Sequence, residues 1–457
     1  MKILILGAGQ VGSTVAENLV SEANDITVVD LDADKLRLLQ DRFDLRTLTG
    51  SASHPSILEQ AGIADADLLL AVTQSDEVNL VACKLAASLH NTPTKIARIR
   101  SSDYLEHPAI FDAENFCVDF SICPEQILTD YISKLIEFPE ALQVLEFADG
   151  LVSLVAVRAV AGGPLVGHPL RHMRGRMPQI DARVAAIFRQ DRPIIPEGDT
   201  VVEAGDEVFF IAATEHIRTI LKELRRMDKP ARRVMIVGGG NIGFRLALSL
   251  EKDYQVKLID HNKKSCERLA GELAHTLVLN GDGTDEKLLA AEHIAETDVF
   301  CALTNDDENN IMSALLAKRA GARKVVALIN RNAYVELVQS GQIDIALSPA
   351  HVTIGSLLAY VRQGDVAVVH SLRRGAAEAL ELVAHGDRES SKVVGRRLDE
   401  VELPKGATIG AIVRGDQVIM GHHDVMIEPD DHVIVFVINK QMIRKVEKLF
   451  QVGVSFF

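Results

Sequence analysis

One glycine-rich segment occurs twice in this chain of 457 residues, and the duplication constrains the fold more than any other feature. The first copy reads KILILGAGQVG over residues 2–12, and the second reads RVMIVGGGNIG over residues 233–243. In both copies an apolar run leads directly into three glycines, after which apolar residues recur at helical spacing. Each copy therefore predicts a strand, a tight turn and the start of a helix.

The spacing of the glycines is typical of a turn that binds phosphate. Gly7 allows the chain to leave the strand in a tight turn, Gly9 lets the backbone approach a pyrophosphate, and Gly12 lets the helix pack close to the strand. The N–H groups at the helix start then face the phosphates, where the helix dipole favours negative charge. The matching glycines of the second copy are Gly238, Gly240 and Gly243.

A carboxylate follows each loop at the distance expected of a ribose-binding residue. Asp30 closes the apolar strand 26–30, and Asp260 closes the strand 256–260. A single glycine pattern could be an ordinary strand-to-helix turn, but two complete strand, turn, helix and aspartate units indicate nucleotide binding. Because no arginine follows either aspartate, both sites favour a free 2′-hydroxyl over the 2′-phosphate of NADP.

Strand-like and helix-like segments alternate from residue 26 to residue 99, which predicts a doubly wound parallel sheet with a ligand crevice at the carboxyl ends of its strands. Each polar residue at those ends could be a helix cap, as Thr73 illustrates, but the set together favours ligand contact. The set comprises Asp30, Gly50, Ser51, Thr73, Asp76, Glu77, Arg98 and Arg100, then Asp260, Gly281, Asp282, Gly283, Thr304, Asn305, Asp306, Asn330 and Arg331.

The duplication extends to two smaller segments with strand-like periodicity. Leu165-Val166-Gly167 returns as Val393-Val394-Gly395, so the order of domains is large, small, large, small. Helices that begin at Pro124 and Pro349 could pack on their own sheets or make subunit contacts, and the sequence leaves both open. We expect nucleotide-binding domains at 1–123 and 233–348, crossover helices at 124–148 and 349–377, small domains at 149–222 and 378–457, and a linker at 223–232.

The composition argues against several kinds of partner and site. With 49 basic and 64 acidic residues the net charge is 49 − 64 = −15, which argues against a nucleic-acid partner. No segment approaches the roughly 20 apolar residues that span a bilayer, so we expect any membrane connection to go through a partner. The five cysteines show neither paired spacing nor ligand-like spacing, which favours reduced cytosolic thiols and no metal site.

A catalytic site is not indicated. A dehydrogenase needs a general acid or base beside the nicotinamide, and neither small segment is patterned to supply one. His168 and His172 lie in a basic loop, and His422 and His423 lie in a turn, where solvation is their expected role. We therefore expect a ligand sensor rather than an enzyme, with an NAD-dependent oxidoreductase of unknown substrate as the alternative.

These features together resemble the duplicated KTN/RCK family, the regulators of potassium conductance. The likeness covers essentially the whole chain and rests on ILGAGQVG with VVD, the run from GSASHPSIL through EQAGIADADLLLAVT to SDEVN, KIARIR, and the late strand GDEVFFIA. It implies two Rossmann-type doubly wound parallel sheets, each followed by a small α+β RCK C-terminal domain, with crossover helices that pair subunits.

The resemblance also implies a function. The chain would be a non-enzymatic regulatory subunit of a potassium uptake system, peripheral on the cytoplasmic face of the inner membrane. It would bind NAD(H), or ATP or ADP, and assemble as a dimer of dimers, a tetramer. That ring would control the gating of a membrane potassium translocation subunit of the TrkH type.

The resemblance carries over to individual positions. The residues implied to hold nucleotide are Gly7, Ala8, Gly9, Gln10, Val11, Gly12, Asp30, Ser51, Thr73 and Arg100 in the first half, and Gly238, Gly239, Gly240, Asn241, Ile242, Gly243, Asp260, Asp282 and Thr304 in the second. One position departs from the family pattern, because the glycine-aspartate pair found at Gly281-Asp282 is Gly50-Ser51 in the first half. Since serine supplies no carboxylate, we expect the two sites to differ in ligand or affinity.

Overall fold

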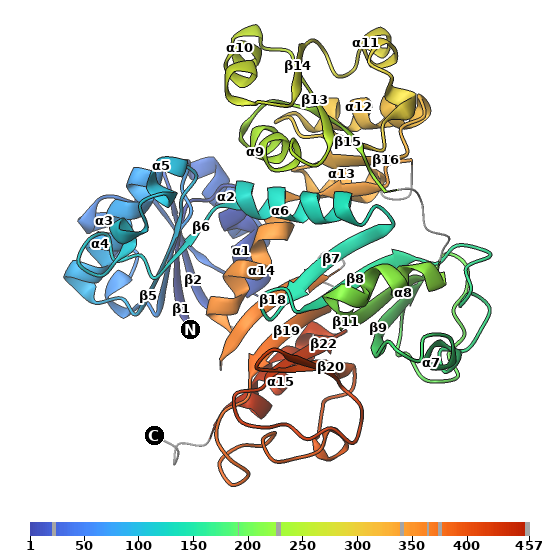
Figure 1. Ribbon diagram of the computed structural model, residues 1–457. Coiled ribbons are helices and arrows are strands. Elements are labelled where there is room, and N and C mark those ends of the chain that lie inside the picture. Colours follow the sequence, from blue (N-terminus) through green and yellow to red (C-terminus); the bar gives the residue numbers. More distant parts are fainter. Residues whose placement is uncertain are drawn as a thin grey trace. The chain divides into compact units, whose positions relative to one another are not determined.

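A computed structural model gives the structure of the chain and describes residues 1–20, 24–190, 192–224, 230–338, 342–362, 365–372 and 377–452 (Figure 1). The chain divides into two compact units, and each is described by itself. Unit 1 comprises Met1–Leu128 and Ser348–Leu357, and unit 2 comprises Thr129–Leu347 and Leu358–Phe457.

Unit 1 is built on a parallel sheet with the strand order β3-β2-β1-β4-β5-β6. Its strands are β1 (Lys2–Leu6), β2 (Asp25–Asp30), β3 (Arg46–Thr49), β4 (Leu68–Ala71), β5 (Thr94–Arg98) and β6 (Phe120–Ile122), and its helices include α1 (Gln10–Val20), α2 (Ala33–Arg42), α3 (Pro55–Gln60), α4 (Asp76–His90) and α5 (Ser102–Leu105). The central strands β1 and β4 are almost wholly apolar and buried, because helices cover both faces of the sheet.

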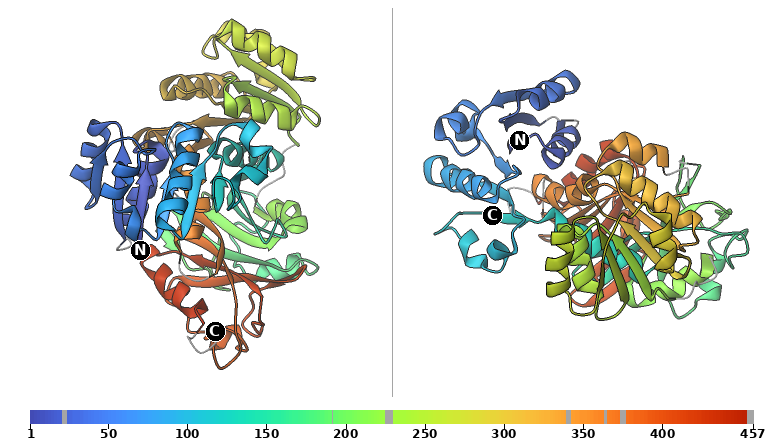
Figure 2. Two further views of the ribbon diagram at one scale, coloured as in Figure 1. Left: turned by 90° about the vertical axis from the view of Figure 1, so that its left-hand side faces the viewer. Right: turned by 90° about the horizontal axis from the view of Figure 1, so that it is seen from above.

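Unit 2 contains a second parallel sheet with the matching order β14-β13-β12-β15-β16-β17. Its strands are β12 (Arg233–Val237), β13 (Gln255–Asp260), β14 (Leu277–Asn280), β15 (Val299–Ala302), β16 (Lys324–Leu328) and β17 (Ile345–Leu347), and its helices are α9 (Asn241–Leu250), α10 (Lys263–Glu272), α11 (Glu286–Ala291), α12 (Asp307–Arg319) and α13 (Asn332–Val338). Helices lie on both faces of each parallel sheet (Figures 1 and 2). The two predicted Rossmann-type sheets are therefore confirmed.

The expected crossover segments, 124–148 and 349–377, are helical only in their first parts. Helix α6 (Pro124–Glu137) ends early and is followed by strand β7 (Ala141–Phe147); likewise, α14 (Pro349–Val361) is followed by β18 (Val366–Leu372). Each extra strand pairs antiparallel with the next one, and this pairing holds both strands extended. Of the expected linker and the second crossover segment, residues 225–229, 363–364 and 373–376 lie outside the described residues.

Each crossover helix is divided between the two units. The first part of α14, Ser348–Leu357, belongs to unit 1 with the first nucleotide-binding domain, whereas α6 continues from unit 1 into unit 2. Inside unit 2 the buried Lys324 ammonium donates to the carbonyl oxygens of Leu135 (3.2 Å) and Ala141 (3.0 Å). A cation at the carboxyl end of α6 is favoured by the helix dipole, so Lys324 fixes that end to the second parallel sheet.

Both small domains are antiparallel sheets, as the α+β prediction requires. The first has the order β10-β9-β11-β8-β7 and the second β18-β19-β22-β20-β21. Their remaining elements are β8 (Val152–Arg158), α7 (His172–Arg176), β9 (Ala182–Arg189), β10 (Arg192–Ile194), β11 (Glu207–Ala213), α8 (Ile217–Leu224), β19 (Ala377–Val383), β20 (Ala407–Arg414), β21 (Gln417–Met420), β22 (His432–Val437) and α15 (Ile443–Phe450).

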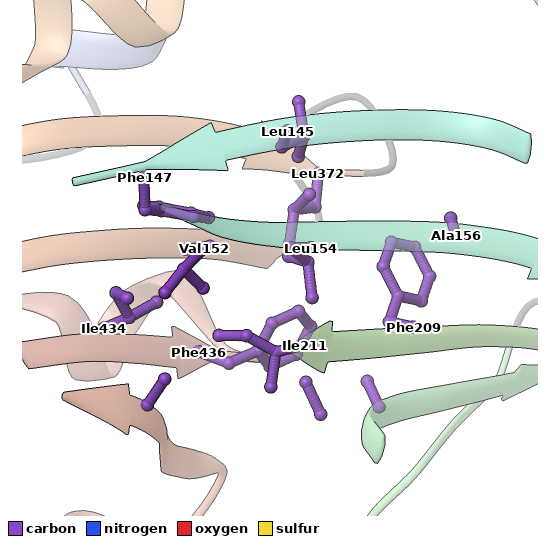
Figure 3. Packing of buried hydrophobic residues seen from close by; sticks show 14 of the residues in the cluster. Leu145, Phe147, Val152, Leu154, Ala156, Phe209, Ile211, Leu372, Ile434 and Phe436 are labelled. Atoms are coloured by element: carbon purple, nitrogen blue, oxygen red, sulfur yellow. The ribbon is translucent and has the colours of Figure 1, made fainter. Parts of the chain in front are cut away.

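The two small sheets share one apolar core inside unit 2 (Figure 3). Phe209 of β11 stacks edge-on against Phe188 of β9, with ring centroids 5.6 Å apart, and lies 6.1 Å from the ring of Phe436 on β22. The same core includes Leu145, Phe147, Val152, Leu154, Ile211, Leu372 and Ile434. Each sheet therefore buries one face against the other, which joins the two halves of the chain.

Candidate nucleotide-binding sites

The first glycine loop connects β1 to α1, and two of its glycines are required by the fold. Gly7 has φ +109°, which is left-handed backbone that residues with side chains rarely adopt. A Cβ on Gly12 would lie 1.9 Å from the Gly7 carbonyl oxygen, so the helix could not pack at its present distance. A Cβ on Gly9, by contrast, would meet no atom of the described residues within 4 Å. Gly9 therefore leaves open space above the loop.

The second loop, between β12 and α9, repeats this geometry. Gly238 has φ +105°, and a Cβ on Gly243 would lie 1.9 Å from the Gly238 oxygen. A Cβ on Gly240 again meets nothing within 4 Å among the described residues. Gly239 differs from its counterpart Ala8, because a Cβ there would lie 2.4 Å from a methyl carbon of Leu269.

The four other predicted loop residues open the two helices. Gln10 and Val11 begin α1, and Asn241 and Ile242 begin α9. The Val11 side chain is buried and packs in the core, so only the backbone N–H of this residue can contribute to the loop. The first-turn N–H groups of a helix lack intrahelical partners and are the groups that bind anions at helix starts in general.

The predicted ribose aspartates lie beside the loops and hold them. Asp30 accepts from the N–H of Ala8 (2.6 Å) through one carboxylate oxygen and from the N–H of Asp32 (2.9 Å) through the other. Asp260 likewise accepts from Gly239 (2.7 Å) and Asn262 (2.7 Å). Each aspartate therefore braces the glycine turn and keeps a carboxylate at the edge of β2 or β13.

The predicted threonines are oriented by two buried asparagines that the sequence analysis missed. The Asn79 side-chain oxygen accepts from the Thr73 N–H (3.0 Å) and hydroxyl (2.7 Å), while its amide donates to the Arg98 carbonyl (2.9 Å). Asn310 makes the same set of bonds with Thr304 (2.9 and 2.7 Å) and with the Leu328 carbonyl (2.8 Å). Both asparagines are fully buried. The repeated pattern D-E-x-N, at residues 76–79 and 307–310, is the signal that could have identified them.

Two aspartates of the same pattern fix the turns after β5 and β16. The Asp76 carboxylate accepts from the N–H groups of Arg100 (2.9 Å) and Ser101 (2.8 Å). Asp307 accepts from the N–H groups of Asn330 (2.9 Å) and Arg331 (2.8 Å). These bonds show which residues of the two halves match: Arg98 corresponds to Leu328, and Arg100 corresponds to Asn330.

The third strand differs between the sites, as the sequence predicts. The Asp282 carboxylate accepts from the N–H and the hydroxyl of Thr284, both at 2.8 Å, and these bonds hold its pKa below the usual value. At the matching position the Ser51 hydroxyl lies 3.0 Å from the Ser53 hydroxyl. The second site thus carries an ionised carboxylate where the first has a neutral hydroxyl.

Arg100 lies at the carboxyl edge of the first parallel sheet, as predicted, but its side chain forms a hydrogen bond with a residue of α6. Its Nε donates to Glu125 Oε1 at 2.9 Å, and Arg98 Nη2 donates to the same oxygen at 3.2 Å. Arg98 belongs to the set of strand-end residues predicted from the sequence, whereas Glu125 was not predicted. This cluster lies within unit 1, next to the β4 end that carries Thr73.

The predicted residues therefore converge on the carboxyl edges of two sheets. In strand order, the first edge carries Ser51, Asp30, the glycine loop, Thr73 and then the arginines. The described residues contain no cluster of three or more histidine, cysteine or acidic side chains suited to a metal ion. Among the helices of the described residues, none has both the length and the apolar character needed to cross a bilayer.

Comparisons with known proteins agree with this architecture. The TrkA-N domain family matches residues 3–114 and 234–349, and the TrkA-C domain family matches residues 154–225 and 388–451. The chain is 60% identical over its whole length to the Trk system potassium uptake protein TrkA of Halomonas elongata, covering all of that protein. It is 58% identical to the protein of the same name from Vibrio alginolyticus, covering 99% of each chain.

Solved structures share the fold at low sequence identity. The GsuK RCK domain matches with a TM-score of 0.61 and 17% identity, over 98% of this chain and 94% of that chain. The GsuK channel bound to NAD matches with a TM-score of 0.61 and 18% identity, over 98% and 78%. The chain therefore belongs to the TrkA family of Trk-system potassium uptake proteins, with the duplicated RCK architecture that its glycine loops and ribose aspartates indicate.

Proposed function

We propose that this protein is a nucleotide-sensing regulatory subunit of a potassium uptake system. It binds NAD(H) or an adenine nucleotide at the two glycine loops and controls the gating of a TrkH-type membrane translocation subunit. The observation that carries the proposal is the open space above Gly9 and Gly240, which the fold itself does not require. The names of its relatives and the fold shared with a channel bound to NAD support this reading.

The ligands are those predicted at the two edges. Asp30 and Asp260 accept the ribose hydroxyls, the loop N–H groups hold the phosphates, and Thr73 and Thr304 line the path beyond them. A ligand shifts an assembly only by the difference between its affinities for two states, typically about 1–3 kcal/mol per site. Two sites in each chain, in a tetramer built as a dimer of dimers, add such increments.

Gating requires no catalytic group, and no observation favours the oxidoreductase alternative. The buried Cys83 and Cys301 thiols lie in the cores of the parallel sheets, where burial raises the pKa of each to about 12, so neither is a nucleophile at neutral pH. We place the protein on the cytoplasmic face of the inner membrane, held there by its translocation partner.

Titration of the full chain with NADH, NAD and ATP tests the proposal. Gly9→Val and Gly240→Val fill the open space above one loop each and are expected to abolish binding at that loop. Gly271→Val, whose added side chain also meets nothing within 4 Å but on helix α10, is the matched control. Nucleotide binding that persists in the Gly9→Val/Gly240→Val double variant contradicts the proposal.

Potassium uptake by cells carrying the same variants tests the regulatory step. Cells whose variant no longer binds nucleotide should lose regulated potassium uptake. Cells that carry the Gly271→Val protein should take up potassium as wild-type cells do. Normal uptake in the nucleotide-free double variant contradicts the gating role and leaves only a scaffold.

A further inference from the structure

Two histidines at one end of the second small sheet face carboxylates, and the proposed function uses neither of them. His385 follows β19, and His432 is the first residue of β22. We propose that these two rings form a proton-sensitive joint, which is held closed while both rings are protonated and loosens when they lose their protons. The joint connects β18, β19 and β22 with the turn after β7, which belongs to the first small domain. Because its ligand is the proton, the inference does not depend on nucleotide binding at the glycine loops.

The first ring lies between two carboxylates. His385 Nε2 is 2.7 Å from Asp365 Oδ2, and its Nδ1 is 3.3 Å from Asp430 Oδ1. A neutral imidazole carries one N–H, whereas the protonated ring donates from both nitrogens. Only the protonated ring can therefore donate to both carboxylates. Because Asp365 directly precedes β18 and Asp430 lies just before β22, this bridge holds the starts of both strands at the end of β19.

The second ring neutralises a buried carboxylate. His432 Nδ1 lies 2.6 Å from Glu381 Oε1, and the side chain of Glu381 is 3% exposed. The other Glu381 oxygen accepts from the Ala148 N–H at 2.8 Å, and Ala148 follows β7 of the first small domain. A buried carboxylate is costly unless a cation and hydrogen-bond donors compensate its charge. Loss of the His432 proton removes that cation and so weakens the contact between the second small sheet and the turn after β7.

The first small domain repeats the backbone of the joint without its histidines. In the second domain the Asp430 N–H donates to the Ala384 carbonyl at 2.7 Å. In the first domain the Gly205 N–H donates to the Ala159 carbonyl at 2.8 Å. Asp430 has φ +62° and Gly205 has φ +95°, so the second domain keeps an aspartate where left-handed backbone favours glycine. By this match the positions of His385, Asp430 and His432 carry Val160, Gly205 and Glu207 in the first domain.

A third histidine, His370 on β18, lies within the field of Glu381 but acts in the opposite direction. Its Nε2 lies 2.9 Å from the Glu146 carbonyl oxygen, a bond that the neutral ring makes, and burial lowers its pKa. His370 therefore stays neutral in the folded chain, and in global unfolding it offsets the joint. A local measurement is needed to follow the joint by itself. The other charged side chains on the surrounding elements are the exposed Asp149, Lys134 paired with Glu146, and Arg414 paired with Glu428 and Asp431.

The raised pKa of His385 sets the pH range of the joint. Hydrogen bonding to Asp365 raises this pKa, burial opposes the shift, and the contact with Asp430 adds to it. The bridge is therefore fully present below the ordinary histidine pKa of about 6.5 and is lost as the pH rises through the raised value. Acid closes the joint, and alkali opens it.

Amide hydrogen exchange of the full chain between about pH 6 and pH 8.5, corrected for the intrinsic effect of pH on exchange, tests the inference. The reporters are the N–H groups of Val383, Asp430 and Ala148, which are hydrogen-bonded within the joint. Their protection should fall as the pH rises, by up to about tenfold per pH unit for each proton released. Protection that stays constant or rises with pH in the unmodified chain would overturn the inference.

Two variants separate the joint from the rest of the fold. His385→Gln/His432→Gln keeps hydrogen-bond donors that cannot take up a proton, so protection at the three reporters should become independent of pH. Asp430→Gly suits the left-handed backbone and removes one carboxylate of the bridge, so it should reduce the pH dependence even if the double variant does not fold. His423→Gln, in the exposed turn after β21, is the matched control and should behave as the unmodified chain does. Unchanged pH dependence in either of the first two variants would contradict the inference.

Discussion

Gly12 lies against Gly7 so closely that a single added carbon would stand 1.9 Å from the Gly7 carbonyl oxygen, and Gly243 and Gly238 repeat this contact. The third glycine of each loop is therefore a packing residue. At the middle glycine an added Cβ would meet no atom of the described residues within 4 Å, so this glycine has no such role.

Gly12→Ala should thus lower the free energy of unfolding by about 3 kcal/mol or more, because the added carbon forces α1 away from β1. Gly9→Ala should leave it unchanged or raise it by up to about 1 kcal/mol, since the backbone there tolerates a side chain. Urea denaturation of the two variants measures the difference. The pair Gly243→Ala and Gly240→Ala repeats the test in the second half, and equal effects within either pair would contradict the assignment.

Asn79 and Asn310 should prove as important for stability as any apolar core residue. Asn79→Ala removes the acceptor of the Thr73 N–H and the donor to the Arg98 carbonyl, at a cost of about 2–3 kcal/mol. Asn310→Ala should cost a similar amount, as judged by urea unfolding. Ser313→Ala serves as the milder control, because this buried residue lies one turn further along α12 and its hydroxyl donates to the Asn310 carbonyl.

A buried ion pair joins the end of α14 to the second small domain. Arg362 Nη2 lies 2.9 and 2.8 Å from the two oxygens of Glu378, and its Nε lies 3.7 Å from Glu447; all three side chains are at most 4% exposed. Arg362→Met should destabilise the protein by about 3–5 kcal/mol, because it leaves two carboxylates buried without their cation. Arg362→Met/Glu378→Gln/Glu447→Gln should recover most of that loss in thermal unfolding. A triple variant no more stable than the single one would contradict this account.

The shared core of the small sheets should make stability sensitive to acid through His370. This ring is buried against Phe147, with centroids 4.9 Å apart, and its Nε2 lies 2.9 Å from the Glu146 carbonyl oxygen. Burial lowers the His370 pKa; the Glu146 carbonyl and the charges of Glu381 and Glu146 oppose that shift without cancelling it.

The lowered pKa of His370 determines how stability depends on pH. Below the ordinary histidine pKa of about 6.5, His370 is protonated in the unfolded chain but stays neutral in the folded chain. The free energy of unfolding therefore falls as the pH falls through that value, by at most about 1.4 kcal/mol per pH unit. Urea unfolding between pH 7.5 and 5.5 should show this slope, and His370→Gln should flatten it. His385 gives the contrast: hydrogen bonding to Asp365 raises its pKa, so its contribution is present below about 6.5 and is lost as the pH rises through the raised value.

Particular residues show how far sequence reasoning reaches. Both loops and the place of Asp30 and Asp260 at the strand ends beside them could be predicted, because strand, turn and helix starts depend on short-range periodicity and on backbone freedom at a few glycines. Strands β7 and β18 were included in the crossover segments and were not recognised as strands. Only pairing with β8 and β19 decides that they are extended.

The amino-acid sequence by itself determined two Rossmann-type units, the position of their glycine loops and the order in which large and small domains follow one another. The tertiary structure alone decided which partners those local elements meet: Asn79 beneath Thr73, Glu125 against Arg98 and Arg100, the start of α14 in unit 1, and one core between the two small sheets. The physical reason is the separation along the chain between the residues that interact. Turns and helix starts are set by neighbouring residues, whereas each of the other contacts joins segments that only become neighbours when the whole chain has folded.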